Sequence, residues 1–196
     1  MLNPDAPIVK PALAAGKPVA AAWLCLGSPT LVELAARNGA EAIVLDLQHG
    51  LFDRVGLEAA VAAAGATPVL VRTRDDHPAN IGDALDAGAE GVIVPLVETE
   101  EAARAVAQAC RFPPHGNRSG GGIRPLADFE AHATRANDAV IAAVMIETKA
   151  GVEAAEAIAR SGVDMVFIGT GDLALSLGVA PGSKAHEEAC QKVLEA

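Results

Sequence analysis

Four polar side chains of kinds common in active sites stand at the ends of short apolar runs. They are His49, Arg72, Glu147 and Asp172. Each run has the length and the β-branched content of a buried strand, and each is followed by a segment with helical character. Ligands of α/β proteins bind at the carboxyl ends of the strands. The sequence therefore predicts that a histidine, an arginine and two carboxylates share one edge of a sheet.

Glu147 and Asp172 are the candidates for a metal site. Each carboxylate follows a strand that we expect to be buried on both faces, where a charge is costly unless it is paired or binds a cation. Two hard oxygen ligands from neighbouring strand ends suit Mg²⁺ or Mn²⁺, which keep other positions for water or substrate. The alternative is that each carboxylate caps the following helix, and Asp172, just before Leu173, is well placed to do so.

His49 and Arg72 are the candidates for proton transfer and anion binding. A histidine at a strand end suits proton transfer near neutral pH, and a guanidinium group suits a carboxylate or a developing oxyanion. Asp46 is placed to anchor the turn before His49, and Asp86 to orient the imidazole from another edge. The alternative for a lone histidine is a ring satisfied by loop carbonyl groups.

Two glycine-rich segments add weaker signals. Residues 169–171, Gly-Thr-Gly, offer backbone N–H groups at the start of a helix, which is a natural site for a carboxylate. Arg118, in the segment 116–120, is a further cation that we place at the same edge. No Gly-Lys-Ser/Thr sequence follows, so the segment is not a nucleotide-binding P-loop.

The elements that must position these residues alternate along the chain. Strands are predicted at 19–26, 42–47, 68–72, 91–95, 140–147 and 164–169, with a brief one near 117–119. Helices are predicted at 29–38, 55–64, 80–87, 98–110, 151–160 and 184–194. Sequential βα units with right-handed crossovers close most simply into a (β/α)8 barrel. We therefore expect one barrel domain, residues 1–196, that has seven strands and lacks the final βα unit. Its open edge predicts an oligomer.

Composition excludes several classes of partner. Asp and Glu number 25 against 15 Lys and Arg, a formal net charge of −10, so the chain has no basic excess for a nucleic-acid backbone. Its uncharged runs are too short for a membrane helix. The three cysteines, Cys25, Cys110 and Cys190, are widely spaced and predict reduced thiols in a cytoplasmic protein.

The motifs around these residues resemble those of the HpcH/HpaI aldolase family. The resemblance covers about residues 23–178, with the motifs in the same order. They are LGSP at 26–29, LDLQHG at 45–50, VR at 71–72, LDAGAEGVIVP at 85–95, PPHGNR at 113–118, IET at 146–148 and FIGTGDL at 167–173.

The resemblance implies a (β/α)8 barrel of the phosphoenolpyruvate/pyruvate superfamily and a class II aldolase. Such enzymes cleave or form 4-hydroxy-2-oxo acids through a pyruvate enolate, with an aldehyde as the second product. They need a divalent metal, Mg²⁺, Mn²⁺ or Co²⁺. The resemblance also implies a cytoplasmic homo-oligomer, a trimer or a hexamer, with small-molecule substrates and neither nucleic-acid nor membrane partners.

Carried over residue by residue, the family pattern assigns a role to each candidate. Glu147 and Asp172 become the metal ligands, and Arg72 holds the pyruvate oxygens. His49 becomes the general acid/base, with Asp86 as its carboxylate partner. The backbone amides of Gly171 and Asp172 would bind the pyruvate carboxylate, with Gln48 and Arg118 as further substrate contacts.

One residue departs from the family pattern, and three other functions stay open. Gln48 stands where the family usually has Glu, which removes a charge but keeps the hydrogen-bonding reach. The alternatives are a CoA-ester lyase of the citrate lyase β/malyl-CoA type, a decarboxylase or synthase that uses the same enolate, and a non-catalytic barrel that binds a small acid.

Overall fold

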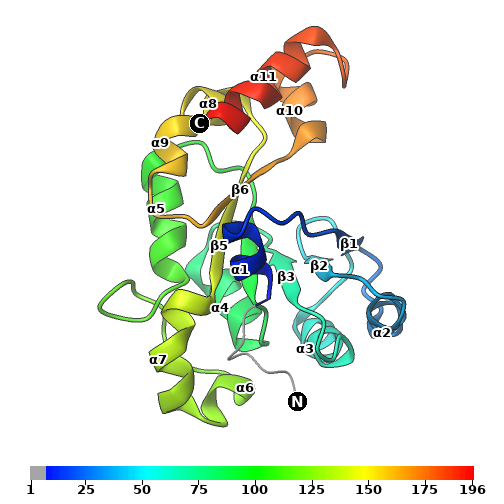
Figure 1. The fold of residues 1–196 in the computed structure, drawn as a ribbon, viewed down its shortest axis with the longest axis vertical. Helices are drawn as coiled ribbons and strands as arrows, with labels where there is room; N and C mark the ends of the chain where they lie inside the picture. The colour runs from blue at the N-terminus through cyan, green and yellow to red at the C-terminus, as the bar shows by residue number, and fades with distance from the viewer. Residues whose placement is uncertain (1–7) are drawn as a thin grey trace.

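A computed structural model describes residues 8–196 and contains a curved sheet of six parallel strands (Figure 1). The strands are β1 (Ala21–Leu24), β2 (Ala42–Asp46), β3 (Val69–Arg72), β4 (Gly91–Val94), β5 (Ile141–Ile146) and β6 (Met165–Ile168). Each strand pairs with the next along the chain, so the sheet order is the sequence order. All carboxyl ends of the strands therefore lie at one edge, as the barrel prediction requires.

Helices connect the strands and cover the outer face of the sheet. They are α2 (Pro29–Arg37), α3 (Arg54–Ala63), α4 (Pro78–Asp86), α5 (Glu100–Ala109), α6 (Ile123–Leu126), α7 (Phe129–Ala139), α8 (Lys149–Glu153), α9 (Ala155–Ala159), α10 (Thr170–Leu177) and α11 (Lys184–Glu195). Helices α6 and α7 lie at one end of the molecule and α10 and α11 at the other (Figure 1). Among the described residues no helix is long and apolar enough to cross a membrane.

Burial differs between the middle and the edges of the sheet. Every residue of β2, β3, β4 and β5 is buried, because helices cover one face and the curved inner face packs on itself. The edge strands β1 and β6 are only partly buried. The rings of Trp23 on β1 and Phe167 on β6 lie in tilted contact on the inner face, with centroids 5.4 Å apart.

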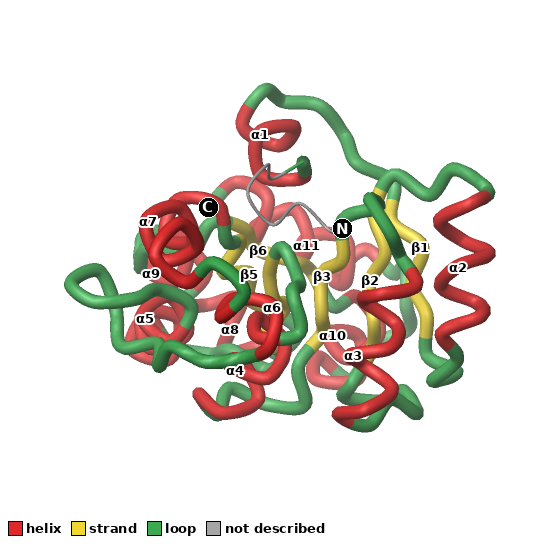
Figure 2. Tube along the Cα trace, turned by 90° about the horizontal axis from the view of Figure 1, so that it is seen from below, coloured by secondary structure: helices red, strands yellow, loops and turns green. Residues whose placement is uncertain are grey.

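A short helix, α1 (Val9–Ala14), covers the inner face near the amino ends of the strands (Figure 2). Val9 packs in the inner cluster. Glu90, just before β4, accepts hydrogen bonds from the backbone N–H groups of Ile8 and Val9 at 2.9 and 2.6 Å. Lys10 pairs with Asp164 before β6 at 3.0 Å. These contacts attach α1 to the edge of the sheet opposite the predicted site.

The structure corrects the sequence prediction at two places. Residues 117–119 form no strand, so the sheet has six strands rather than seven, two fewer than a closed eight-stranded barrel. The residues between this segment and β5, for which the sequence predicted no helix, contain α6 and α7. Only Ala136 is buried in α7, so this helix lacks the apolar stripe that would have predicted it.

Candidate active site

The carboxyl ends of β2 and β3 are joined by a buried ion pair. Asp46 is the last residue of β2 and Arg72 the last of β3, and the two are direct neighbours in the strand register. The Arg72 Nε–H donates to Asp46 Oδ1 at 3.0 Å, and Nη2 donates to Oδ2. The side chains are only 11% and 1% exposed. The pair is bidentate, and this geometry holds the guanidinium group in one orientation.

Asp46 also organises the turn that carries His49. Its Oδ1 accepts the backbone N–H groups of Gln48 at 3.0 Å and His49 at 3.1 Å, and its Oδ2 accepts the Trp23 indole N–H at 3.2 Å. Burial alone would raise the pKa of Asp46, but the hydrogen bonds from Arg72, His49 and Trp23 outweigh it and hold the pKa well below its usual range. The carboxylate therefore stays charged, and it anchors the turn as the sequence predicted.

Glu147 is buried in a different way, because half of its carboxylate has no partner. Its Oε1 accepts the backbone N–H of Leu96 at 2.8 Å, whereas Oε2 is buried and makes no hydrogen bond among the described residues. Burial, together with the negative charge of Asp172, raises the pKa of Glu147 against the opposing effects of Leu96 and Arg72. A buried acceptor without a partner is costly and marks a position where a cation would be stabilised.

Gly169 makes room for this carboxylate. A Cβ atom at position 169 would lie 2.3 Å from Glu147 Oε2 and 2.6 Å from its Cβ. Only glycine therefore lets the end of β6 pass so close to Glu147. Asp172 follows in the first turn of α10, where it is partly buried. The end of β6 thus brings together Glu147, which follows β5, and Asp172 on α10.

The two carboxylates fit a divalent cation that keeps several other ligands. Among residues 8–196 no group of three or more His, Cys, Asp or Glu side chains is arranged to hold a metal ion. Mg²⁺ is typically held by one or two carboxylates and completes its shell with water and substrate. The unpartnered Oε2 of Glu147 and the nearby Asp172 supply that kind of site, so the residues present fit the group.

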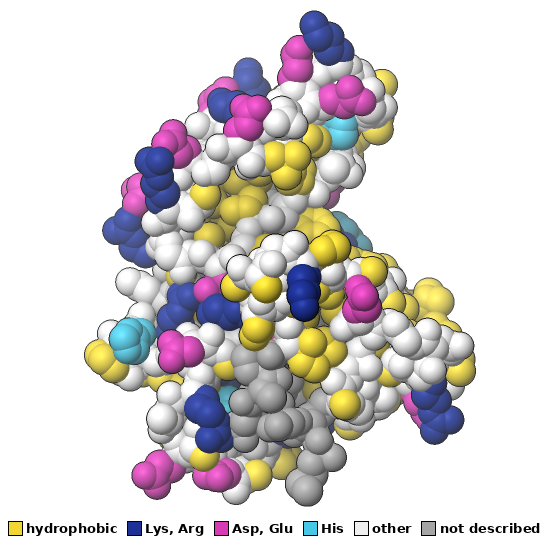
Figure 3. All heavy atoms as spheres, viewed as in Figure 1, with side chains coloured by type: hydrophobic (Ala, Val, Ile, Leu, Met, Phe, Trp, Pro, Cys, Tyr) yellow, Lys and Arg dark blue, Asp and Glu magenta, His cyan; other side chains and the backbone are white. Residues whose placement is uncertain are grey.

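His49 and Gln48 lie beside this edge without side-chain partners. The His49 side chain is exposed and makes no hydrogen bond within the described chain, and Gln48 Oε1 is buried without a partner. The hollow below α10 and α11 has hydrophobic side chains in its wall (Figure 3). Exposed leucines follow several strand ends on this side of the molecule. They are Leu26, Leu51, Leu96 and Leu175.

Asp86 and Arg118 do not join the site within this chain. Asp86 is the last residue of α4, at the end of the molecule opposite the carboxyl ends of the strands. Its Oδ1 accepts a hydrogen bond from Arg118 Nη2 at 3.0 Å, and the Arg118 guanidinium group lies 4.6 Å from the centre of the Phe112 ring. The structure therefore pairs the two residues with each other, and neither reaches His49 here.

Comparison with known proteins gives the family. A sequence profile of the HpcH/HpaI aldolase/citrate lyase family matches residues 20–196. The 4-hydroxy-2-oxovalerate aldolase of Rhodococcus jostii (strain RHA1) is 37% identical over 193 residues, which cover 95% of this chain and 74% of that protein. This chain belongs to the HpcH/HpaI aldolase/citrate lyase family.

Other family members agree in sequence and in fold. The hydroxypyruvate/pyruvate aldolase of Rhizorhabdus wittichii is 38% identical over 171 residues, covering 85% of this chain and 68% of that protein. A crystal structure of a family protein from Burkholderia cenocepacia J2315 matches with a TM-score of 0.90 and 31% identity, covering 95% of this chain and 79% of that one. The predicted family, the barrel-type α/β fold and the aldolase type of enzyme are confirmed.

Sequence reasoning missed two features of the site. Asp46 was interpreted as an anchor for a turn, but it is also the bidentate partner of Arg72. The signal was present, because an acidic and a basic residue end two consecutive strands of a parallel sheet. The role of Gly169 was also missed, since only the structure shows the Glu147 carboxylate against its Cα.

Proposed function

We propose that this enzyme catalyses the reversible cleavage of a 4-hydroxy-2-oxo acid to pyruvate and an aldehyde, with a divalent cation held by Glu147 and Asp172. The observation that carries the proposal is the buried Oε2 of Glu147, which has no hydrogen-bond donor among the described residues and whose carboxyl group feels the negative charge of Asp172. Membership of the family supports the reaction type. The names of the relatives, which include aldolases of 4-hydroxy-2-oxovalerate and of hydroxypyruvate/pyruvate, support a small 2-oxo acid as substrate.

The cation has one task in this proposal. Bound by the two carboxylates, Mg²⁺, Mn²⁺ or Co²⁺ would act as a Lewis acid that polarises the ketone of the substrate. Its positive charge would also remove the cost of the unpartnered carboxylate oxygen.

Arg72 stabilises the charge that forms when the carbon–carbon bond breaks. The bond between C3 and C4 breaks, and its electron pair moves toward the 2-oxo oxygen to give the enolate of pyruvate. A guanidinium group aimed at that oxygen stabilises the enolate more than the neutral ketone, which lowers the barrier. Asp46 fixes the guanidinium beforehand, so little reorganisation is needed during the reaction.

His49 moves the proton. Its imidazole takes the proton from the 4-hydroxyl oxygen as the aldehyde C=O forms, and the enolate is then protonated at C3 to give pyruvate. The side chain is exposed at the end of β2 and makes no other hydrogen bond within the described residues, which leaves it available to substrate. Because Asp86 is paired with Arg118, we assign Asp86 no step within this chain.

The start of α10 binds the substrate carboxylate. The first N–H groups of a helix have no intrahelical acceptor, and the helix dipole favours an anion there. In α10 these include the N–H groups of Gly171 and Asp172. Gln48, with its unpartnered carbonyl oxygen, is placed to contact substrate or a bound water at the other side of the site.

We also propose one domain for residues 1–196, a cytoplasmic location and a homo-oligomeric working form, a trimer or a hexamer. The free edges of β1 and β6 and the exposed leucines at the carboxyl ends support an oligomer, because such surfaces are seldom left open to water. Sedimentation of the active protein tests this, and a fully active monomer at micromolar concentration would contradict it.

The test of the proposed reaction is a pyruvate-release assay over a panel of 4-hydroxy-2-oxo acids, with CoA thioesters as the competing substrates. The assay is run with Mg²⁺, Mn²⁺ or Co²⁺ and again with excess EDTA. We expect pyruvate release only with a metal, and none from Glu147→Gln. Full activity in EDTA, or cleavage of the thioesters alone, would contradict the proposal.

A further inference from the structure

The helix that carries Asp172, α10, packs on the core mainly through Leu173, which is fully buried. Only Leu173 and Ala174 of α10 are buried, and its N-cap, Gly169, has no side chain to hold the first turn. At its far end, Ser176 Oγ accepts the backbone N–H of Lys149 at 3.0 Å. The first turn, which carries Gly171 and Asp172, thus has no side-chain hydrogen bond from its own N-cap.

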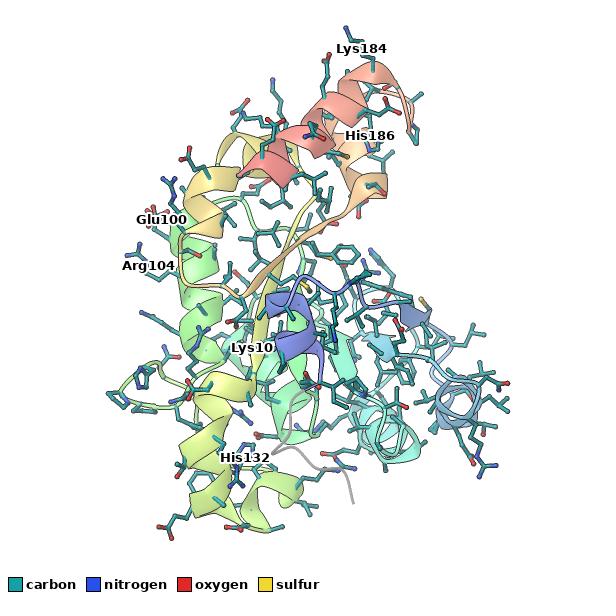
Figure 4. The ribbon with its side chains drawn as sticks, in the orientation of Figure 1. Lys10, Glu100, Arg104, His132, Lys184 and His186 are labelled. Carbon is teal, nitrogen blue, oxygen red and sulfur yellow. The ribbon has the colours of Figure 1, made fainter. Side chains whose placement is uncertain are left out.

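His186 on α11 contacts this turn. Its Nε2 lies 2.9 Å from the carbonyl oxygen of Thr170, and its Nδ1 accepts the backbone N–H of Gly182 at 3.1 Å. Because Nδ1 is an acceptor, the proton of the neutral ring lies on Nε2 and is donated to Thr170. The residue is only 6% exposed. Figure 4 shows His186 between α11 and α10.

Both ring nitrogens are thus used by backbone groups of two separate segments. The bond to Gly182 closes the turn before α11 and would stabilise that helix alone. The bond to Thr170 reaches across to α10, two residues before Asp172. A residue that served only as a cap for α11 would not need this second bond.

We propose that His186 is a positioning residue, which holds the first turn of α10 and thereby sets the geometry of Asp172 as a metal ligand. The inference rests on the proposed metal site at Glu147 and Asp172. Groups that orient metal ligands without touching the metal strongly affect affinity. His186 acts in this way through the Thr170 carbonyl group.

Two substitutions separate the two bonds of the ring. His186→Asn places an amide oxygen near the position of Nδ1, so the acceptor for Gly182 is kept and the donor to Thr170 is lost. His186→Gln places an amide N–H near the position of Nε2, so the donor to Thr170 is kept. If His186 only caps α11, the Gln variant should show the greater loss. If His186 holds α10 through Thr170, the Asn variant should show the greater loss.

A matched control lies at the other end of the molecule. Asn137 on α7 also bridges two backbone groups, accepting the Phe112 N–H at 2.7 Å and donating to the Phe112 carbonyl at 3.2 Å. Asn137→Ala removes a comparable pair of bonds far from α10. It should lower stability without changing metal binding.

The experiment uses the full chain and two measurements. The exchange rates of the backbone amides of residues 170–177, measured without metal, report directly how firmly α10 is held. The dissociation constant for Mn²⁺, measured by electron paramagnetic resonance, reports its consequence. For His186→Asn we expect faster exchange and about 10-fold weaker Mn²⁺ binding, the lower end of what such supporting groups contribute. His186→Gln should restore most of both losses, and Asn137→Ala should match the wild type.

The possible failures are distinguishable. Wild-type Mn²⁺ affinity or unchanged exchange of α10 in His186→Asn would overturn the positioning role, while the metal site would stand. A greater loss in His186→Gln than in His186→Asn would show a cap for α11 and would also overturn it. If the Asn variant does not fold, weakened Mn²⁺ binding by a folded Gln variant overturns the proposal. Wild-type protein that binds no Mn²⁺ would overturn the proposed function and, with it, the role of His186.

Discussion

The two halves of the site satisfy their buried charges in opposite ways. In the half formed by β2 and β3, Asp46 and Arg72 satisfy each other, and Asp46 also accepts three further N–H groups. In the half formed by β5, β6 and α10, Glu147 has one backbone donor and one oxygen without a partner, and the negative charge of Asp172 acts on it more strongly than the positive charge of Arg72. The charges of the first half are satisfied within the chain, whereas those of the second half would be satisfied by the cation that we propose.

The strands and helices that carry the two halves of the site also differ in how firmly they are held. Strands β2 and β3 are buried along their whole length and pair with neighbours on both sides. Strand β6 is a partly buried edge strand, and α10 is held by a few hydrogen bonds. The half formed by β2 and β3 therefore holds its guanidinium group rigidly, whereas the half formed by β5, β6 and α10 is held by fewer contacts and would be stabilised by a bound metal. The comparison predicts different responses to mutation in the two halves.

Removal of Asp46 should have the largest effect on stability. Asp46→Ala leaves the buried Arg72 guanidinium without its partner, which typically costs about 3–5 kcal/mol. The free energy of unfolding in urea, measured without metal, checks this value. The control is Glu100→Ala, because Glu100 pairs with Arg104 on the exposed face of α5 (Figure 4), and such pairs contribute about 0.3–0.5 kcal/mol.

The lowered pKa of Asp46 also fixes the sign of a pH effect. A carboxyl group whose pKa is lower in the folded state stabilises the protein above its unfolded pKa, about 3.9. That contribution is lost as the pH falls toward the folded pKa. Wild-type protein should therefore lose stability more steeply below about pH 4 than Asp46→Ala. Equal slopes would show that the ion pair adds no stability.

Arg72→Lys should have the next largest effect, on turnover rather than on folding. A lysine ammonium cannot bind both oxygens of Asp46 in the bidentate geometry of Arg72 and also donate a further N–H to the enolate. We expect kcat to fall on the order of 10²-fold, as for the loss of one oxyanion donor. Steady-state kinetics of pyruvate release measure this, and kinetics close to wild type would make Arg72 a structural residue.

Much of the first half was predictable from the sequence, because its residues belong to long apolar runs. The runs at 42–47 and 68–72 locate β2 and β3, and parallel pairing then places their ends together. The predicted strand near 117–119 was wrong, because no apolar run supports a strand there. Asp128, which accepts the Ala131 N–H at the start of α7, was the signal for the helix that was missed.

Less of the second half could be predicted, because it depends on contacts between distant segments. The motifs at 146–148 and 167–173 indicate the two carboxylates, but the close approach of Glu147 to Gly169 and the bond from His186 to Thr170 appear only in three dimensions. The predicted partnership of His49 and Asp86 shows the same limit. His49 follows the carboxyl end of β2, whereas Asp86 ends α4 at the opposite end of the sheet.

Glu147→Gln should separate stability from metal binding. Burial raises the pKa of Glu147 in the folded state, so the charged carboxylate lowers the stability of the metal-free protein. This cost is absent below the pKa of the unfolded state and develops as the pH rises through the raised pKa of the folded state. Neutral Gln avoids this cost, so the stability of the metal-free variant at pH 7 should be equal to that of the wild type or higher.

Mn²⁺ at 100 times its dissociation constant should stabilise the wild type by about 2.7 kcal/mol and leave the Glu147→Gln variant unchanged. Thermal unfolding with and without Mn²⁺ measures both, and equal stabilisation would exclude Glu147 as a ligand.

The smallest expected effects come from two glycines that lie two residues apart. A Cβ at Gly169 would collide with the Glu147 carboxylate, and such overpacking costs about 1–3 kcal/mol. A Cβ at Gly171 would meet nothing within 4 Å, and its helical position suits alanine, so Gly171→Ala should stabilise the protein by about 0.4–1 kcal/mol. The Gly171 N–H is kept in Gly171→Ala, so this variant should still release pyruvate. Gly169→Ala should bind Mn²⁺ weakly, because Glu147 is displaced.

Both variants add one methyl group to the β6–α10 connection, and they differ in where that methyl group points. If both weakened Mn²⁺ binding equally, the cause would be the rigidity of the β6–α10 connection, and the space reserved for Glu147 would not be what makes this half of the site a metal site.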